Sequence, residues 1–178
     1  MAKRKIHYTE HYAEVMKALT SHGLLVGSYD AGGKANAMTI GWGSLGSVWG
    51  MPLWMVLVRP SRYTYQCIEH SGCFTVNVPT EAMGMACALC GSKSGRDTDK
   101  FAEAKLTAAK ASTVLAPIVD ECPIVYECQV VHSSDILPSK LADEILTGSY
   151  VGGDYHRVYC GKILAAYADP AGVKSLRR

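Results

Sequence analysis

The chain has 178 residues, of which 48% are hydrophobic and 19% are charged, and its formal net charge is +2. This composition excludes a disordered chain, and the length suits a single domain, residues 1–178, with a sizeable core. The net charge is too small to indicate binding to nucleic acid or to a membrane surface, so neither is expected as a partner.

The sequence predicts a cytoplasmic protein that crosses no membrane. The start of the chain is basic but has no apolar region after it, so no signal peptide is expected. Residues 35–58 carry no charge and are long enough to span a bilayer. However, this run contains several glycines, a proline and no helical period, so we interpret it as buried strands and close-packed loops.

The cysteines predict reduced thiols rather than a metal site. Their count is 7, an odd number without secretory context. Cys87 and Cys90 form a lone CxxC with no second pair, and a zinc site needs four ligands, so no metal is expected. The pair is interpreted as small buried helix residues, with a redox pair as the alternative.

The first elements in chain order are a helix and a β-hairpin. Apolar residues at helical spacing predict an amphipathic helix over Thr9–Thr20. Strands are expected over Leu24–Tyr29 and Ala35–Trp42, joined by the turn residues Asp30–Lys34.

The second strand of this hairpin has one bulky and one small face. Asn36 and Met38 belong to the bulky face, and Ala37 and Thr39 to the small one. A small face allows a flat ring to approach the backbone, although packing under a neighbouring helix explains it equally well. The glycines that follow are expected to mark tight bends or bulges.

Basic and hydroxyl residues then gather where a strand gives way to a helix. The buried strand Leu53–Val58 leads through Arg59–Arg62 into a short helix, Tyr65–His70, which Gly72 closes. The first turn of a helix has free N–H groups and a partial positive charge, and arginine adds bidentate contacts to phosphate oxygens. The junction therefore predicts a phosphate site, with a plain N-cap by Ser61 as the alternative.

A second stretch of similar chemistry follows about 30 residues later. A strand over Cys73–Val78 and a helix over Thr80–Cys90 precede the loop Gly91–Phe101, which is flexible, basic and rich in hydroxyls. Such a loop can wrap an anion with backbone N–H groups, serines and a lysine, and a disordered surface loop is the alternative. A short helix is expected over Asp99–Lys105.

The last third of the chain is rich in Val, Ile, Tyr and Thr, which favour strands. The expected strands are Val114–Ile118, Ile124–His132, Glu144–Val151 and Arg157–Ala166. The tail after Pro170 is expected to form a final helical turn or an arm. Six or more strands with few helices between them predict an antiparallel barrel or sandwich, not a doubly wound sheet.

Four segments, in this order and at these spacings, resemble the flavin reductase-like family, and within it the flavoredoxin-like proteins. They are Asn36–Trp42, Arg59–Thr64, Phe74–Pro79 and Ser94–Phe101. The resemblance covers about residues 20–168. It implies a mainly β fold, a six-stranded antiparallel split β-barrel with Greek-key connections and flanking short helices. It also implies a homodimer with one FMN per subunit, bound near the dimer interface.

The same resemblance implies which residues bind the cofactor. The residues that lie against the isoalloxazine ring would be Asn36, Met38 and Thr39. Those that face the ribityl chain and phosphate would be Arg59, Ser61, Arg62 and Tyr63, and those that close over the same end would be Ser92, Lys93, Ser94 and Arg96.

Many members of the family carry Gly-Asp-His near the last strands, tied to nicotinamide use. This chain has a tyrosine inserted there, Gly153-Asp154-Tyr155-His156. His156 is the candidate catalytic residue on the nicotinamide side, and a structural or solvated histidine is the alternative.

The function that follows is an FMN-binding oxidoreductase with NADH or NADPH as electron donor. It is either a flavin reductase or a flavoredoxin-like electron transfer protein that meets a redox partner protein. In both cases the cofactor carries the chemistry and the protein supplies position and electrostatics. The alternatives are a non-enzymatic FMN electron carrier, a split barrel for haem or pyridoxal phosphate, and an interaction domain that has lost its ligand.

Overall fold

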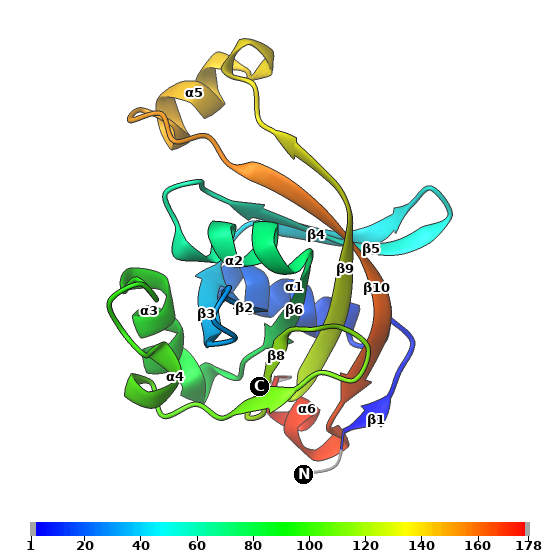
Figure 1. Cartoon of the computed structure of the whole chain (residues 1–178). Helices are drawn as coiled ribbons and strands as arrows, with labels where there is room; N and C mark the ends of the chain where they lie inside the picture. The colour runs from blue at the N-terminus through cyan, green and yellow to red at the C-terminus, as the bar shows by residue number, and fades with distance from the viewer. Residues whose placement is uncertain (1–2, 177–178) are drawn as a thin grey trace.

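The apolar runs of the sequence form an antiparallel sheet that curls into an open barrel (Figure 1). The computed structural model describes residues 3–176. In this part of the chain the strand order is β3-β2-β6-β9-β10-β5-β4, and β1 pairs with β10. The strands of this sheet are β1 (Arg4–Lys5), β2 (Leu24–Tyr29), β3 (Ala35–Ile40), β4 (Gly43–Val48), β5 (Met51–Val58), β6 (Cys73–Val78), β9 (Ile124–Asp135) and β10 (Arg157–Ala168).

Short helices and one small ribbon surround this sheet. The ribbon pairs β7 (Ala108–Lys110) with β8 (Pro117–Val119). The helices are α1 (Tyr12–Ser21), α2 (Tyr63–Ser71), α3 (Gly84–Ser92), α4 (Lys100–Glu103), α5 (Asp143–Ser149) and α6 (Pro170–Leu176), with 3-10 turns at Glu81–Met83 and Pro138–Lys140. No helix among the described residues is both long and apolar enough to cross a membrane.

The inner face of the sheet holds the main core. Trp54, Phe74 and Tyr126, from three different strands, are completely buried there. The rings of Trp54 and Tyr126 meet edge to face, with centroids 5.7 Å apart, a geometry that aromatic pairs prefer. Burial of such large apolar surfaces is the main force that closes the sheet on itself.

The barrel is open where the chain passes from β3 to β4. These two end strands of the sheet follow one another in the sequence, joined by Gly41 and Trp42, but they pair with β2 and β5 and not with each other. The ends of β3 and β5 therefore line an opening rather than a closed wall.

β9 and β10 continue beyond the barrel as an arm that carries α5 (Figure 1). Arg157 fixes the start of β10 by bonding both oxygens of Asp135, at 2.7 and 2.9 Å. The prediction of a strand over Glu144–Val151 is wrong, because this segment forms α5. Two acidic residues, Asp143 and Glu144, occupy its first turn, where their negative charges stabilise the helix by interacting with the positive end of its dipole.

The prediction of bends or bulges at the glycines after β3 is also wrong in part, since Gly43 and Gly46 lie in strand β4. A Cβ atom at Gly43 would lie 2.8 Å from the carbonyl oxygen of Met55 and 3.5 Å from the ring of Trp54. The glycine therefore permits close pairing of β4 with β5, which sequence alone does not distinguish from a turn.

The strand predicted over Val114–Ile118 is β8, which begins later, at Pro117. The residues before it form a loop held by Glu127, whose buried carboxylate accepts bonds from the backbone N–H groups of Ser112 and Thr113. A buried carboxylate with several donors orders a loop that carries no strand period of its own.

The remaining predicted elements are confirmed with small shifts of their ends. β2 and β6 match their predicted ranges, α1 begins at Tyr12 instead of Thr9, and the tail forms α6. All 7 cysteines are free and buried, and no cluster of possible metal ligands occurs among residues 3–176. Cys87 and Cys90 lie on α3 in a small apolar core with Leu25 and Phe101, as expected for buried helix residues.

Candidate functional site

Two joined cavities lie at the opening of the barrel. The larger has a volume of about 220 Å³, and the smaller one of about 90 Å³. Both are lined by Met38, Arg62 and Gly91, so they form one continuous depression with a broad end and a narrow end. The other residues of the broad end are Thr39, Ile40, Gly41, Trp42, Leu57, Arg59 and His156. Those of the narrow end are Ser61, Tyr63, Thr64, Cys90, Ser92, Lys93, Ser94, Arg96 and Lys100.

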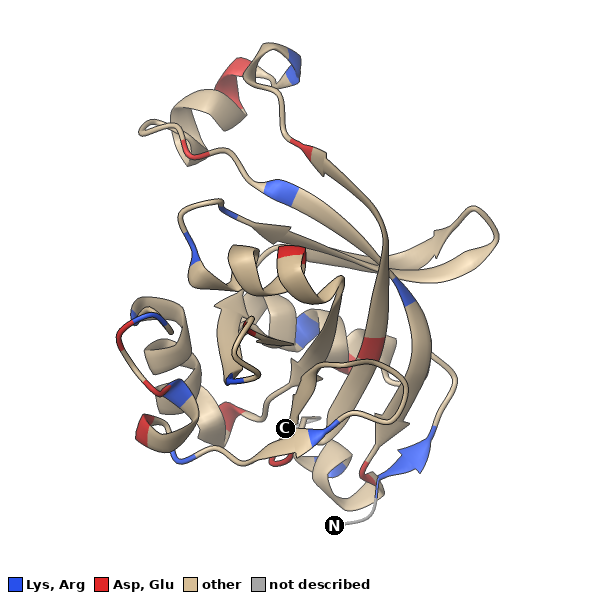
Figure 2. Ribbon diagram, viewed as in Figure 1, with Lys and Arg blue, Asp and Glu red and all other residues tan. Residues whose placement is uncertain are grey.

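The narrow end is where the two basic stretches predicted from the sequence meet. Arg96, from the α3–α4 loop, donates to the carbonyl oxygen of Ser61 at 3.1 Å and lies over the Tyr63 ring, 5.4 Å from its centroid. Figure 2 shows the basic residues of the β5–α2 junction and of the α3–α4 segment on the same side of the molecule. The prediction that these distant segments converge is confirmed.

Gly95 explains why the loop can lie so close to β3 and α2. A side chain at this position would overlap the amide oxygen of Asn36 and would lie 2.8 Å from Cδ1 of Tyr63. Asn36 is buried, and its amide nitrogen donates to Thr64 at 2.8 Å. The predicted ring contact Asn36 thus joins β3 to α2 and supports the loop from below.

Lys100 is the buried cation of the narrow end. Its side chain is among the most buried charged groups of the protein, with 4% of the residue exposed, and Nζ donates to the carbonyl oxygens of Ala37 and Cys90, each at 2.9 Å. An ammonium has three N–H donors, so one remains for the cavity. No carboxylate pairs with Lys100 among the described residues, and burial lowers its pKa. A buried cation without a counter-ion favours an anionic ligand.

The first basic stretch divides into two roles. Arg62 is exposed at the rim, and no hydrogen bond or ion pair engages its side chain among the described residues. Arg59 instead donates to the carbonyl oxygens of Ser149, Gly153 and Asp154, at 3.1 to 3.3 Å. Arg59 lines the broad end, but in this structure its guanidinium holds the loop that follows α5.

Ser61 is not the N-cap of α2. Arg62 is at that position, and no side chain caps the helix. The Ser61 hydroxyl donates to Oδ2 of Asp154 at 2.6 Å, so it also fastens the loop after α5. The alternative in which Ser61 caps the helix is therefore wrong, because α2 begins one residue later than a Ser61 cap requires and no N–H of its first turn donates to the Ser61 hydroxyl.

The loop residues predicted to close over the ligand line the narrow end and also bond to their own segment. Ser92 donates to the carbonyl of Ala88, Lys93 pairs with Glu103, and the Ser94 hydroxyl accepts from the N–H of Arg96. These contacts fix the shape of the loop without help from a ligand.

Tyr63 closes the inner side of the narrow end. Its hydroxyl donates to Asp30 at 2.8 Å, and this bond, followed by burial, raises the pKa of Tyr63 to about 12. Asp30 also accepts from the N–H groups of Gly32 and Lys34, so the hairpin turn is tied to α2. The bond from Lys34 is the main cause that lowers the pKa of Asp30, with the Tyr63 hydroxyl second.

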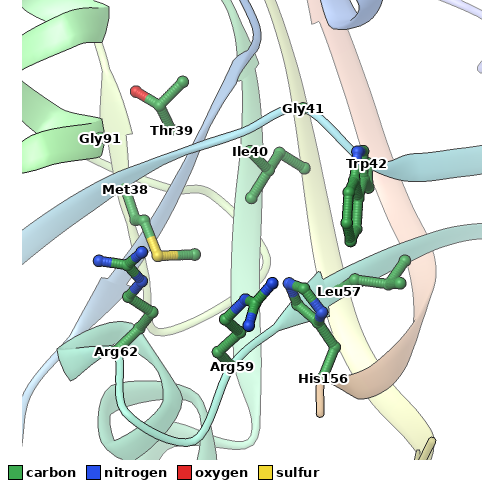
Figure 3. Close-up of a pocket in the computed structure, with 10 residues that line it drawn as sticks. All are labelled: Met38, Thr39, Ile40, Gly41, Trp42, Leu57, Arg59, Arg62, Gly91 and His156. Carbon is green, nitrogen blue, oxygen red and sulfur yellow. The ribbon is translucent and has the colours of Figure 1, made fainter. Parts of the chain in front are cut away.

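The broad end has apolar and aromatic walls. Figure 3 shows Met38 and Ile40 on one side of β3, facing Arg62, Arg59 and His156, while Thr39 points to the other side, toward Gly91. The hydroxyl of Thr39 donates to the carbonyl of Cys87 on α3 at 2.6 Å.

The small face of β3 packs under α3, although Thr39 also lines the broad end of the cavity. Ala37 is fully buried in the apolar core beneath α3, and Thr39 is bonded to that helix. The alternative, small residues that pack under a helix, is confirmed. The face that carries Met38 and Ile40 is the one that borders the cavity, together with the backbone of Gly41.

His156 lies at the far end of the broad cavity, buried to 9% exposure. Its Nδ1 is 2.7 Å from the hydroxyl of Tyr150, and its ring centroid is 5.0 Å from that of Trp42. The pKa of His156 is lowered to about 4, mainly by burial. The positive charges of Arg59 and Arg62 lower this pKa as well, whereas the negative charge of Asp154 raises it. The imidazole is therefore neutral at pH 7.

This pKa predicts a loss of stability in acid. The unfolded chain binds a proton at His156 near the ordinary histidine pKa of about 6.5, whereas the folded protein binds it only near 4. Stability that His156 contributes above pH 6.5 is therefore lost as the pH falls toward 4, by at most about 1.4 kcal/mol for each unit of the pKa difference. Denaturant titrations over this range should show a smaller loss for His156→Gln than for the wild type. The exposed His132→Gln serves as the control, and an unchanged slope in His156→Gln contradicts the assignment.

Two residues of the site were missed by the sequence predictions. Lys100 lies within the segment Ser94–Phe101 that resembles the family, but no local pattern marks it as buried, because its burial depends on contacts with β3 and α3. Trp42 was placed in β3, but the strand ends at Ile40 and the ring stands at the cavity mouth, 45% exposed.

Comparison with known proteins agrees with this geometry. A family model described as the flavin reductase like domain matches residues 16–175. No curated protein matches the chain. The structure of flavoredoxin from Desulfovibrio vulgaris (Miyazaki F) is 28% identical, with a TM-score of 0.68 over 84% of this chain and 70% of that one.

Two further solved structures share the fold at lower identity. An FMN-binding domain of a flavin reductases-like enzyme from Shewanella baltica OS155 is 20% identical, with a TM-score of 0.67 over 94% of this chain and 78% of that one. A flavin reductase with a split barrel domain from Shewanella frigidimarina NCIMB 400 is 19% identical, with a TM-score of 0.68 over 93% and 81%. The chain therefore belongs to the flavin reductase-like family, and its open antiparallel barrel is a split barrel of that family.

Proposed function

We propose that the joined cavities bind FMN, with the phosphate in the narrow end and the ring system in the broad end. The observation that carries this proposal is the convergence of the two basic stretches around a small cavity whose wall contains the buried Lys100. An anion placed there would meet the unused N–H of Lys100 and the guanidinium of Arg62.

The residues present fit such a ligand. The buried ammonium of Lys100 has no carboxylate partner among the described residues, and a dianionic phosphate would supply one. Gly91 lies where the two cavities join, and a Cβ atom there would be 3.4 Å from Cβ of Thr39 on the neighbouring strand. The absence of a side chain keeps the passage open for a chain such as ribityl.

The broad end suits a planar ring because it combines apolar side chains with backbone groups. Met38, Ile40 and Leu57 offer apolar contact, and Trp42 offers an aromatic edge at the mouth. Haem and pyridoxal phosphate are less favoured, since neither needs an elongated path between a flat pocket and a separate phosphate site.

The proposed activity is an oxidoreductase that uses NADH or NADPH. Bound FMN would accept a hydride and pass electrons, one or two at a time, to an acceptor. The protein binds and orients the flavin, shields one side of it with β3, and stabilises negative charge through Arg59, Arg62 and Lys100. His156 is neutral and lies at the ring end, where it would contact the second reactant.

A flavoredoxin-like electron carrier is the second candidate, because a solved structure that is 28% identical to this chain is described as a flavoredoxin. In that case a redox partner protein, not a nicotinamide, delivers electrons. The homodimer stays a prediction, and the exposed Val48, Trp49 and Val131 give it an apolar surface.

Titration of the flavin-free protein with FMN, followed by anaerobic addition of NADH or NADPH, tests the proposal. We expect saturable quenching of FMN fluorescence and then loss of the visible absorption band of the oxidised flavin. Binding without reduction by either nicotinamide supports the electron carrier instead. Absence of FMN binding contradicts both candidates. If the purified protein instead shows the absorption spectrum of haem or of pyridoxal phosphate, that group is the ligand.

A further inference from the structure

A further cavity lies between the β2–β3 turn, the end of α2 and the loop that joins β7 to β8. Its volume is about 470 Å³, larger than either of the two joined cavities and typical of sites for small molecules. Among residues 3–176, those that line it differ from those that line the joined cavities. We call it the β7–β8 cavity, and flavin binding gives no reason for its shape.

The β7–β8 loop forms one rim of this cavity and is held from within the protein. The carboxylate of Glu127, a residue that is 1% exposed, accepts from the backbone N–H groups of Ser112 and Thr113 and from the hydroxyl of Thr113. The thiol of Cys73 donates to the carbonyl oxygen of Leu115 at 3.2 Å. The loop is therefore ordered before any ligand arrives, which reduces the entropy lost on binding.

The β2–β3 turn forms the opposite rim, and its one carboxylate is already engaged. Oδ1 of Asp30 accepts from the N–H groups of Gly32 and Lys34, and Oδ2 accepts from the hydroxyl of Tyr63. A carboxylate has about four acceptor positions, so three of them are taken. Asp30 therefore has little capacity left for a ligand with N–H donors.

The groups that remain available in the cavity are apolar or cationic. Val114 and Leu115 line it from the β7–β8 loop, and Leu115 is 68% exposed although its backbone is fixed. Lys110 and His70 line it as well, and no hydrogen bond or ion pair engages either side chain within the described part of the chain. The cavity thus combines an apolar wall with an unpaired ammonium and an imidazole.

We propose that the β7–β8 cavity is a second binding site, for a small and mainly apolar molecule that carries one carboxylate. Lys110 would pair with the carboxylate, His70 would add an N–H donor, and the loop residues would cover the apolar part. A cationic molecule would be repelled by Lys110 and would find Asp30 occupied. An uncharged molecule would gain the apolar contacts without the ion pair.

Calorimetric titration of the flavin-free protein with 1-naphthylacetate and 1-naphthylacetamide tests the ligand class, because the two probes differ mainly in charge. We expect saturable binding of both, with naphthylacetate about three- to tenfold tighter. Lys110→Met should weaken naphthylacetate by that factor and leave the amide unchanged. Lys174→Met is the matched control, since Lys174 is an exposed lysine of α6 that lines none of the three cavities.

Two further variants locate the bound probe. Leu115→Ala should weaken both probes, because it removes apolar contact, and Leu115 is too exposed for its truncation to disturb the fold. Arg62→Ala should change neither, because Arg62 lines only the joined cavities.

Three results overturn the proposal. The first is no saturable binding, or equal affinity for the two probes in the wild type. The second is weaker binding in Arg62→Ala with none in Lys110→Met, which would place the probe in the joined cavities. The third is a dimer in sedimentation that Leu115→Ala dissociates, which would show that a second copy of the chain covers the cavity. None of these measurements uses FMN, so failure of the proposed function appears separately, as wild-type protein that binds naphthylacetate but not FMN.

Discussion

Replacement of Arg62 by alanine is expected to weaken FMN binding about 10- to 100-fold. Loss of one charge-assisted hydrogen bond to a phosphate costs about 1.5–3 kcal/mol, which is roughly one to two decades in affinity. Arg62 lines both cavities, and no hydrogen bond or ion pair engages its side chain among the described residues. Its guanidinium is thus available to a ligand, and its removal should leave the stability of the fold nearly unchanged.

Fluorescence titrations with FMN and with riboflavin separate a phosphate contact from a general effect. Riboflavin has the same ring but no phosphate, so its affinity should be almost equal in Arg62→Ala and in the wild type. Arg4→Ala is the matched control, because Arg4 is exposed and pairs with Glu10, apart from the cavities. Equal FMN affinity in Arg62→Ala and wild type would show that the phosphate is bound elsewhere.

Replacement of Lys100 by methionine is expected to lower both stability and FMN affinity. The carbonyl groups of Ala37 and Cys90 each lose a buried donor, so the free energy of unfolding should fall by about 2–4 kcal/mol. The FMN phosphate would lose the remaining N–H of the ammonium and the one buried positive charge of the narrow end, for a further loss of about 10- to 100-fold in affinity.

Chemical denaturation of the flavin-free protein and FMN titration below the unfolding transition measure the two effects independently. Lys17→Met removes an exposed lysine of α1 and should change neither quantity. If Lys100→Met loses stability but binds FMN as the wild type does, Lys100 only joins β3, α3 and α4, and the anion is held by exposed side chains.

Several strands could be predicted from the sequence because their pattern is local. β2 and β6 consist of short apolar runs bounded by glycine, proline or turn residues, and their ends were predicted correctly. β4 was missed because Gly43 serves close strand pairing over Trp54, a contact that depends on a partner strand. The segment at α5 was predicted as a strand because it is rich in residues that favour strands, whereas the end of the arm offers it no strand to pair with.

The candidate site divides along the same line. The two basic, hydroxyl-rich stretches were predicted as a shared anion site from their residue chemistry, and the family resemblance named Arg62, Tyr63 and Arg96 within them. Alternation gives two faces of β3 but does not say which of them a helix covers.

The sequence by itself determined the antiparallel class of the fold, the positions of most of its strands along the chain and the presence of two basic, hydroxyl-rich stretches. These features depend on periodicity and residue chemistry, which act between near neighbours in the chain. Only the tertiary structure decided that Arg59 and Ser61 hold the loop after α5, that Lys100 is buried under the narrow end, and that Tyr150 meets His156. Each of these depends on a hydrogen bond between side chains and groups that folding alone brings within reach, and burial makes each bond costly to leave unmade.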